Sequence, residues 1–240
     1  MRGVPPIESL TIVSGHYGCG KTTVSLNLAL DLARTGAEVT LVDLDVVNPY
    51  FRSSDHASLL ERHGVRLIAP TFAGTTLDAP SLPASVGSAF DLAGFVIIDV
   101  GGDDAGATAL GRYSSEIAPL DYDLLYVVNR YRNLTGTPGE ASALLGEIEA
   151  ASHLKATAVV NNSHLQRETT VDTVLDAVEF ARTTAGLRGL PLRFTTVPAG
   201  LADRFDDTPG AAGYVENAYP VQAYVRTPWD PSPRADEEVL

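Results

Sequence analysis

The chain has 240 residues, of which 45% are hydrophobic, so it suits one α/β domain with a sizeable core and disorder is not expected. Acidic residues outnumber basic ones by 30 to 17, and the formal net charge of −13 repels nucleic acid and anionic lipid on average. The sequence offers no apolar run of the roughly 18 residues that span a bilayer, no signal-peptide core in residues 1–6, and one cysteine, Cys19, too few for an intrachain disulfide. We expect a cytoplasmic protein with neither a membrane nor a nucleic acid partner.

Short runs rich in Val, Ile and Leu alternate along the chain with helical patterns. Near-continuous apolar runs are typical of parallel strands that are covered on both faces. The clearest helix is expected at 22–35, and another at about 171–187, where a Thr169–Asp172 pair resembles a capping box. The expected strands are Leu10–Ser14, Val39–Val42, Val65–Ile68, Phe95–Ile98, Leu124–Val128, Ala156–Val160 and Phe194–Val197.

This alternation predicts a doubly wound α/β fold, in which a mainly parallel sheet carries helices on both faces. In such folds ligands bind at the carboxyl ends of the strands. Residues 1–225 are expected to form a single domain. Residues 226–240 are rich in proline and then acidic, and are expected to form a tail.

The first expected strand is followed by a segment that matches G-x-x-x-x-G-K-[ST]. A position between a strand and a helix supports a phosphate-binding loop, whose backbone N–H groups and helix dipole face the phosphates. Lys21 is expected to neutralise the β- and γ-phosphates, and the Thr22 hydroxyl to bind Mg²⁺. The predicted nucleotide-binding residues of this segment are Gly15, His16, Tyr17, Gly18, Cys19, Gly20, Lys21, Thr22 and Thr23.

A second metal-binding group is expected at the end of the apolar run 95–98, where Asp99 stands in a Walker B position. Asp99 and Gly102 have D-x-x-G spacing, which predicts that the Gly102 N–H lies near the γ-phosphate. A strand-end aspartate can also be a simple cap. Asp103 and Asp104 either help to position metal-bound water or cap the next helix.

Asp43 and Asp45 stand at the end of another apolar run. Carboxylates two residues apart face the same side of an extended chain, so the pair can orient a water molecule for attack on the γ-phosphate. Asx turns that leave the strand are the alternative. The predicted catalytic residues are therefore Lys21, Asp43 and Asp45.

Together these elements resemble the MinD/ParA branch of SIMIBI-class P-loop ATPases, which includes nitrogenase iron protein and the CobQ/CobB group. The resemblance covers about residues 8–200, implies ATP and Mg²⁺ as cofactors, and associates Asp45 with water activation. Members carry a signature lysine that crosses a dimer interface to the partner's nucleotide, whereas this chain has His16 there. The resemblance thus implies an ATP-dependent homodimer. Candidates to replace the missing charge are Arg112, Arg130 and Arg132, each of which can also be a solvated surface residue.

Base selectivity is predicted from the segment that follows the run 156–160. Guanine-selective P-loop proteins carry N-K-x-D there, whereas this chain has Asn161-Asn162-Ser163-His164, with neither the Lys nor the Asp in place. The amide of Asn161 or Asn162 is suited to reading adenine. We therefore expect ATP rather than GTP.

The residues that are missing exclude some relatives' functions. A 4Fe–4S centre held between subunits needs two thiolates from each, so cluster binding is not expected with Cys19 alone. The leading hypothesis is a slow Mg-dependent ATPase that acts as a switch or assembly factor for an unidentified protein partner. The alternatives are an ATP-dependent ligase of the dethiobiotin synthetase or cobyrinate synthase kind, with a substrate pocket at 71–83, and a non-hydrolysing binding module.

Overall fold

The computed structural model describes residues 3–45, 52–70, 85–165, 168–215 and 217–225. Within them an eight-stranded sheet has the order β3-β2-β4-β1-β5-β6-β7-β8, and every neighbouring pair is parallel. The predicted doubly wound α/β fold is confirmed. The strands are β1 (Leu10–Gly15), β2 (Val39–Leu44), β3 (Arg66–Ile68), β4 (Phe95–Val100), β5 (Tyr122–Val128), β6 (Ala158–Asn161), β7 (Leu192–Pro198) and β8 (Ala218–Val221).

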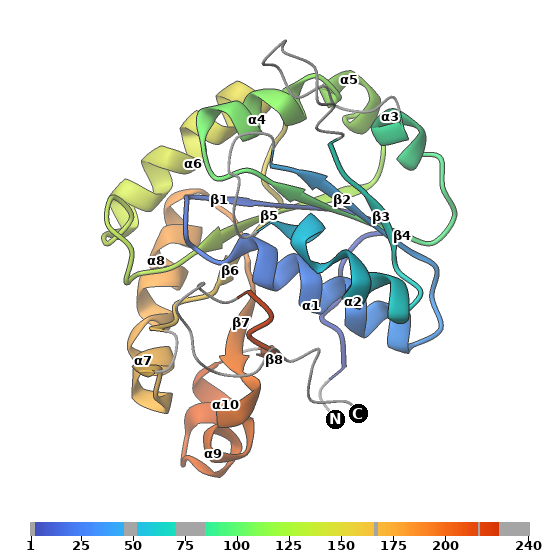
Figure 1. Cartoon of the computed structure of the whole chain (residues 1–240). Coiled ribbons are helices and arrows are strands. Elements are labelled where there is room, and N and C mark those ends of the chain that lie inside the picture. The colour runs from blue at the N-terminus through green and yellow to red at the C-terminus, as the bar shows by residue number, and fades with distance from the viewer. Residues whose placement is uncertain (1–2, 46–51, 71–84, 166–167, 216, 226–240) are drawn as a thin grey trace.

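Helices cover both faces of the sheet (Figure 1). α1 and α2 lie against one face, and α3, α4, α5 and α6 lie against the other. The helices are α1 (Lys21–Arg34), α2 (Ala57–Arg62), α3 (Ser85–Ala89), α4 (Asp104–Gly111), α5 (Ser114–Ile117), α6 (Pro138–Ser152), α7 (Val171–Asp176), α8 (Val178–Leu187), α9 (Ala202–Asp207) and α10 (Ala211–Tyr214). No helix in these described ranges is both long enough and apolar enough to cross a membrane.

The apolar character of the strands follows from this double cover. Ile12 and Val13 are adjacent on β1, so their side chains point to opposite faces of the sheet. Ile12 packs in the cluster beneath α4 and α6, and Val13 in the cluster beneath α1. Because both side chains are fully buried, no alternation with polar residues is visible in the sequence.

Two predicted helical features were wrong in detail. The single helix expected at 171–187 is divided at Ala177 into α7 and α8. Its N-cap is Thr170, whose side chain pairs with Thr173, whereas Thr169 was expected to pair with Asp172. The Thr169 hydroxyl instead accepts a hydrogen bond from the backbone N–H of Leu165.

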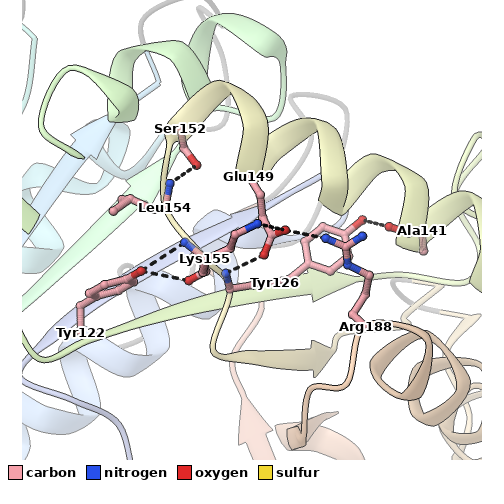
Figure 2. A network of polar contacts seen from close by, with 9 residues as sticks. Tyr122, Tyr126, Ala141, Glu149, Ser152, Leu154, Lys155 and Arg188 are labelled. Carbon is pink, nitrogen blue, oxygen red and sulfur yellow. Dashed lines mark hydrogen bonds and ion pairs between the residues drawn. The ribbon is translucent and has the colours of Figure 1, made fainter. Parts of the chain in front are cut away.

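A network of charged groups around the buried Glu149 joins three elements at the amino ends of the strands (Figure 2). Glu149, on α6, accepts hydrogen bonds from Lys155, from the backbone N–H of Ala156 and from Arg188. Burial alone would raise the pKa of the Glu149 carboxyl, but these hydrogen bonds and charges outweigh it and lower the pKa. The network fixes α6 and the start of β6 to the end of α8. It lies at the opposite end of the strands from the expected nucleotide site.

Three predictions lie outside the described residues: the acidic tail at 226–240, the substrate pocket at 71–83, and the segment 46–51 that follows the aspartate pair.

Candidate nucleotide-binding site

Residues 16–20 form the connection between β1 and α1, as the motif predicts. Lys21 is the first residue of α1, is only 8% exposed, and donates from Nζ to the backbone carbonyl of His16 at 3.1 Å. Gly20 is the N-cap with φ 91°, a conformation that residues with a Cβ rarely adopt. The loop and the start of the helix therefore have the positions expected of a phosphate site.

The outer part of the loop combines an exposed aromatic ring with a neutral histidine. Tyr17 is 56% exposed, and His16 is partly buried. Burial, and then the charge of Lys21, lower the pKa of His16, so its imidazole is uncharged at neutral pH. The departure from a lysine at this position therefore removes a positive charge.

One of the three candidate arginines lies directly against the loop. A Cβ placed on Gly18 would have the Arg132 side chain as its nearest neighbour, with Nε at 3.5 Å and Cζ at 3.6 Å. The turn that carries Arg132 is fixed by Asn129, whose side-chain oxygen accepts from the Tyr131 N–H at 3.0 Å. Arg130 instead donates to the carbonyl of Asp176. Arg112 is the exposed C-cap residue of α4.

Asp43 and Asp99 are direct neighbours in the register of β2 and β4. Asp99 is 2% exposed and accepts hydrogen bonds from the hydroxyls of Ser25 and Ser53, at 3.2 Å from Ser25. Burial, and then the charge of Asp43, raise the pKa of Asp99 to about 6. Neither serine was predicted, because no sequence pattern joins residues 25, 53 and 99.

Asp43 holds the two ends of the segment that follows β2. Its Oδ1 accepts from the N–H of Asp45 at 2.9 Å, and its Oδ2 accepts from the N–H of Ser54 at 3.0 Å. The bond from Asp45 is an Asx-turn bond, so the structural alternative foreseen for Asp43 is present, whereas the bond from Ser54 joins residues 11 apart in the sequence. Asp45 is partly exposed, and its Oδ1 lies 3.3 Å from where a Cβ on Gly101 would be. Of the pair, Asp45 is therefore the more accessible carboxylate.

Gly102 brings the segment after β4 onto the phosphate loop. A Cβ at this position would lie 2.6 Å from Lys21 Nζ and 2.7 Å from Tyr17 Cα, so only glycine fits without displacing the loop. Asp103 caps α4, because its Oδ1 accepts from the N–H of Gly106 at 2.9 Å. Asp104 is the exposed first residue of that helix.

The two asparagines at the end of β6 are both buried, at 0% exposure for Asn161 and 4% for Asn162. Asn161 Oδ1 accepts from Ser163, while its Nδ2 has no hydrogen-bond partner within the described part of the chain. Asn162 donates from Nδ2 to the carbonyl of Cys19 at 2.7 Å and accepts from Thr196 at 2.6 Å. Both polar atoms of the Asn162 side chain are therefore already bound within the protein.

Replacing Asp99 with asparagine is expected to stabilise the fold at neutral pH. The folded-state pKa of about 6 lies above the unfolded value of about 3.9, so the folded state disfavours the charged form. Ionisation of Asp99 therefore lowers the free energy of unfolding. This loss of stability is absent below about pH 4, grows as the pH rises, and reaches up to about 3 kcal/mol once the pH exceeds the folded-state pKa. Asparagine removes the charge and so the penalty.

Melting temperatures of the parent and Asp99→Asn, at neutral pH and near pH 4, test this expectation. The gain should be several degrees at neutral pH and should shrink on acidification. Asp91→Asn, at an exposed position, is the control and should show no gain. An Asp99→Asn protein that melts at or below the parent's temperature at neutral pH would show that Asp99 carries no such penalty.

Residues 10–162 match the family model described as the CobQ/CobB/MinD/ParA nucleotide binding domain. Among curated proteins, the iron-sulfur cluster carrier protein of Bacillus subtilis (strain 168) is 52% identical over 42 residues, which cover 18% of this chain and 12% of that protein. The iron-sulfur cluster carrier protein of Deinococcus radiodurans is 36% identical over 80 residues, which cover 28% of this chain and 23% of that protein. The matches thus span less than a quarter of these relatives.

The similarity to solved structures supports the fold and nothing more specific. The signal recognition particle receptor FtsY from Elizabethkingia anophelis, in complex with GDP, has a TM-score of 0.51 at 20% identity, covering 78% of this chain and 57% of that one. The signal recognition particle 54 kDa protein from Aeropyrum pernix K1, in complex with GDP, has a TM-score of 0.53 at 18% identity, covering 80% of this chain and 42% of that one.

Proposed function

Because the chain belongs to the CobQ/CobB/MinD/ParA family of nucleotide-binding domains, we propose that it is a Mg-dependent, slow ATPase that acts as a switch for a protein partner. The observation that carries the proposal is the contact of Gly102 with Lys21 and Tyr17. Through it, the segment that follows β4 lies against the residues assigned to the terminal phosphate. Loss of the terminal phosphate would therefore change the contacts of the surface segment that begins at Gly102.

Magnesium fits the oxygen groups that surround Asp99 at the carboxyl end of β4. The Asp99 carboxylate is surrounded by the hydroxyls of Ser25 and Ser53, and Thr22 also hydrogen-bonds to it. These are hard oxygen donors of the kind that Mg²⁺ prefers, and Mg²⁺ takes its other ligands from phosphates and water. In this proposal Thr22 and Asp99 hold the ion, which neutralises charge on the phosphates.

Hydrolysis requires a group that orients the attacking water. Asp45 is proposed for this role because its carboxylate is partly exposed beside Gly101, whereas both oxygens of Asp43 are occupied by backbone N–H groups. Asp43 then serves to fix the segment that carries Asp45. In this proposal Asp43 has a structural role and Asp45 orients the water, whereas the spacing alone suggests that both orient it.

The positive charge missing at His16 is proposed to come from Arg132 of the same chain. Its guanidinium lies against Gly18, beside the residues that are proposed to bind the phosphates. A charge supplied within the chain does not require a second subunit. We therefore propose that the ATP-dependent homodimer implied by the resemblance associates only weakly. ATP rather than GTP remains the proposed nucleotide.

The curated relatives are named iron-sulfur cluster carriers, but their similarity to this chain is confined to a small part of their length. The one cysteine of this chain, Cys19, is 1% exposed, and burial raises the pKa of its thiol. A protonated, buried thiol is a poor cluster ligand. We therefore propose that nucleotide binding is the shared property and that cluster carriage is not.

The switch is tested with immobilised Asp45→Asn protein, which is expected to hold ATP without hydrolysing it. Incubated with a lysate of the source organism, the Mg-ATP form should retain a protein that the Mg-ADP form releases. Sedimentation of the same variant with each nucleotide shows whether that protein is a second copy of the chain. Lys21→Ala should retain nothing. Identical retention and sedimentation with ATP and ADP would contradict a switch.

A further inference from the structure

Asn162 connects the phosphate loop to strands that lie far away in sequence. It follows β6 directly, and its backbone N–H donates to the carbonyl of Val128 at the end of β5 at 2.8 Å. Its side chain then reaches the carbonyl of Cys19, 143 residues earlier, at 2.7 Å. A Cβ on Gly20 would lie 2.1 Å from Asn162 Nδ2, so the loop is closely packed against this amide.

The bond to Cys19 controls the direction of a neighbouring donor. The Cys19 carbonyl and the Gly20 N–H belong to one planar trans peptide, in which C=O and N–H point in opposite directions. Holding the carbonyl toward Asn162 therefore turns the Gly20 N–H away from Asn162. In a phosphate loop the backbone N–H groups must converge on the phosphates, so the orientation of this peptide affects how well they bind.

The amide of Asn162 is itself fixed from β7. Thr196 is fully buried, and its hydroxyl lies 2.6 Å from Asn162 Oδ1 and 3.2 Å from the carbonyl of Asn161. The single hydroxyl proton favours the shorter bond. The hydroxyl oxygen can then accept from His164 Nε2, which lies 3.0 Å away. With that tautomer, donors run in one direction from His164 through Thr196 and Asn162 to Cys19.

We propose that Asn162, held by Thr196, is a positioning residue that orients the Cys19–Gly20 peptide for phosphate binding and does not read the base. The inference rests on the proposed function, in that the loop binds the phosphates of a nucleotide. It reassigns a residue whose sequence position suggests adenine recognition. Its distinctive consequence is that Asn162 matters equally for ligands with different bases and for a ligand with none.

The test compares the affinities of ATP, GTP and inorganic tripolyphosphate, each with Mg²⁺, in purified variants of the 240-residue chain. Asn162→Ala should weaken all three by a similar factor of about tenfold, the size of one lost hydrogen bond to a buried partner. A base-reading residue would weaken ATP and leave tripolyphosphate unchanged. That second outcome overturns the proposal.

Thr196 provides a pair of variants that separates positioning from folding. Thr196→Val keeps the shape but removes the hydroxyl, and should weaken all three ligands. Thr196→Ser keeps the hydroxyl and should restore the parent's affinities. Equal affinities in the valine and serine variants, at matched melting temperatures, would overturn the role of the Thr196–Asn162 bond.

Lys21→Ala distinguishes failure of this proposal from failure of the proposed function. If Lys21→Ala loses tripolyphosphate binding while Asn162→Ala keeps it, the loop binds phosphate and only the positioning role is wrong. If Lys21→Ala binds tripolyphosphate as the parent does, the loop is not the phosphate site, and both proposals fail.

Discussion

Lys21→Ala is expected to reduce affinity for Mg-ATP by about 100-fold, because each hydrogen bond to a charged phosphate is worth about 1.5–3 kcal/mol. Lys21 is the only lysine in the loop, and its ammonium lies between the His16 carbonyl and Gly102. Calorimetric titration of the parent and the variant measures the loss. The fold should survive, because the side chain makes no ion pair with any group in the described part of the chain.

The chain offers a matched control for this change. Lys155 is its only other lysine and lies at the opposite edge of the sheet, where it pairs with Glu149 at 3.1 Å (Figure 2). Lys155→Ala should bind Mg-ATP as the parent does. If Lys21→Ala also binds like the parent, the assignment of the phosphate loop is wrong.

Asp45→Asn should lose hydrolysis by about 100-fold or more while keeping its affinity for Mg-ATP, because an amide cannot accept a proton from water. Single-turnover hydrolysis and nucleotide binding, measured on the same preparation, separate the two effects. Asp121→Asn, at an exposed position before β5, is the control and should hydrolyse ATP at the parent's rate.

An Asp45→Asn protein as active as the parent would move the water-orienting role elsewhere. Asp43 would be a poor replacement, because its Oδ1 and Oδ2 already accept from the N–H groups of Asp45 and Ser54. A loss of binding together with hydrolysis would instead place Asp45 among the groups that hold the metal or the nucleotide.

Much of the fold was predictable because the sheet is buried on both faces. Seven of the strands were predicted from short apolar runs. Ile12 and Val13 show why such runs occur: they are adjacent in β1, and their side chains pack in the apolar clusters on opposite faces of the sheet. β8 was missed because its sequence, Ala-Tyr-Pro-Val, contains Pro220 and is not a continuous run of Val, Ile and Leu. Proline is tolerated there because β8 pairs only with β7 and lies at the edge of the sheet.

The phosphate loop and Asp99 were predictable because their spacing is local. The residues that hydrogen-bond to them could not be predicted, because they lie far away in the sequence. Ser53 reaches Asp99 across 46 residues, and Asn162 reaches Cys19 across 143, so no periodicity or short motif records either contact. Arg132 was one of three candidate arginines, and its place beside Gly18 depends on the turn that Asn129 fixes.

Hydrogen exchange with and without Mg-ATP tests the central claim, that the nucleotide binds at the phosphate loop, most directly. Binding should slow exchange most strongly at the backbone N–H groups of residues 16–23 and at Gly102, since these are the donors assigned to the phosphates. The effect should disappear in Lys21→Ala and persist in Lys155→Ala. Unchanged exchange at residues 16–23, with protection elsewhere or nowhere at saturating Mg-ATP, would contradict the account.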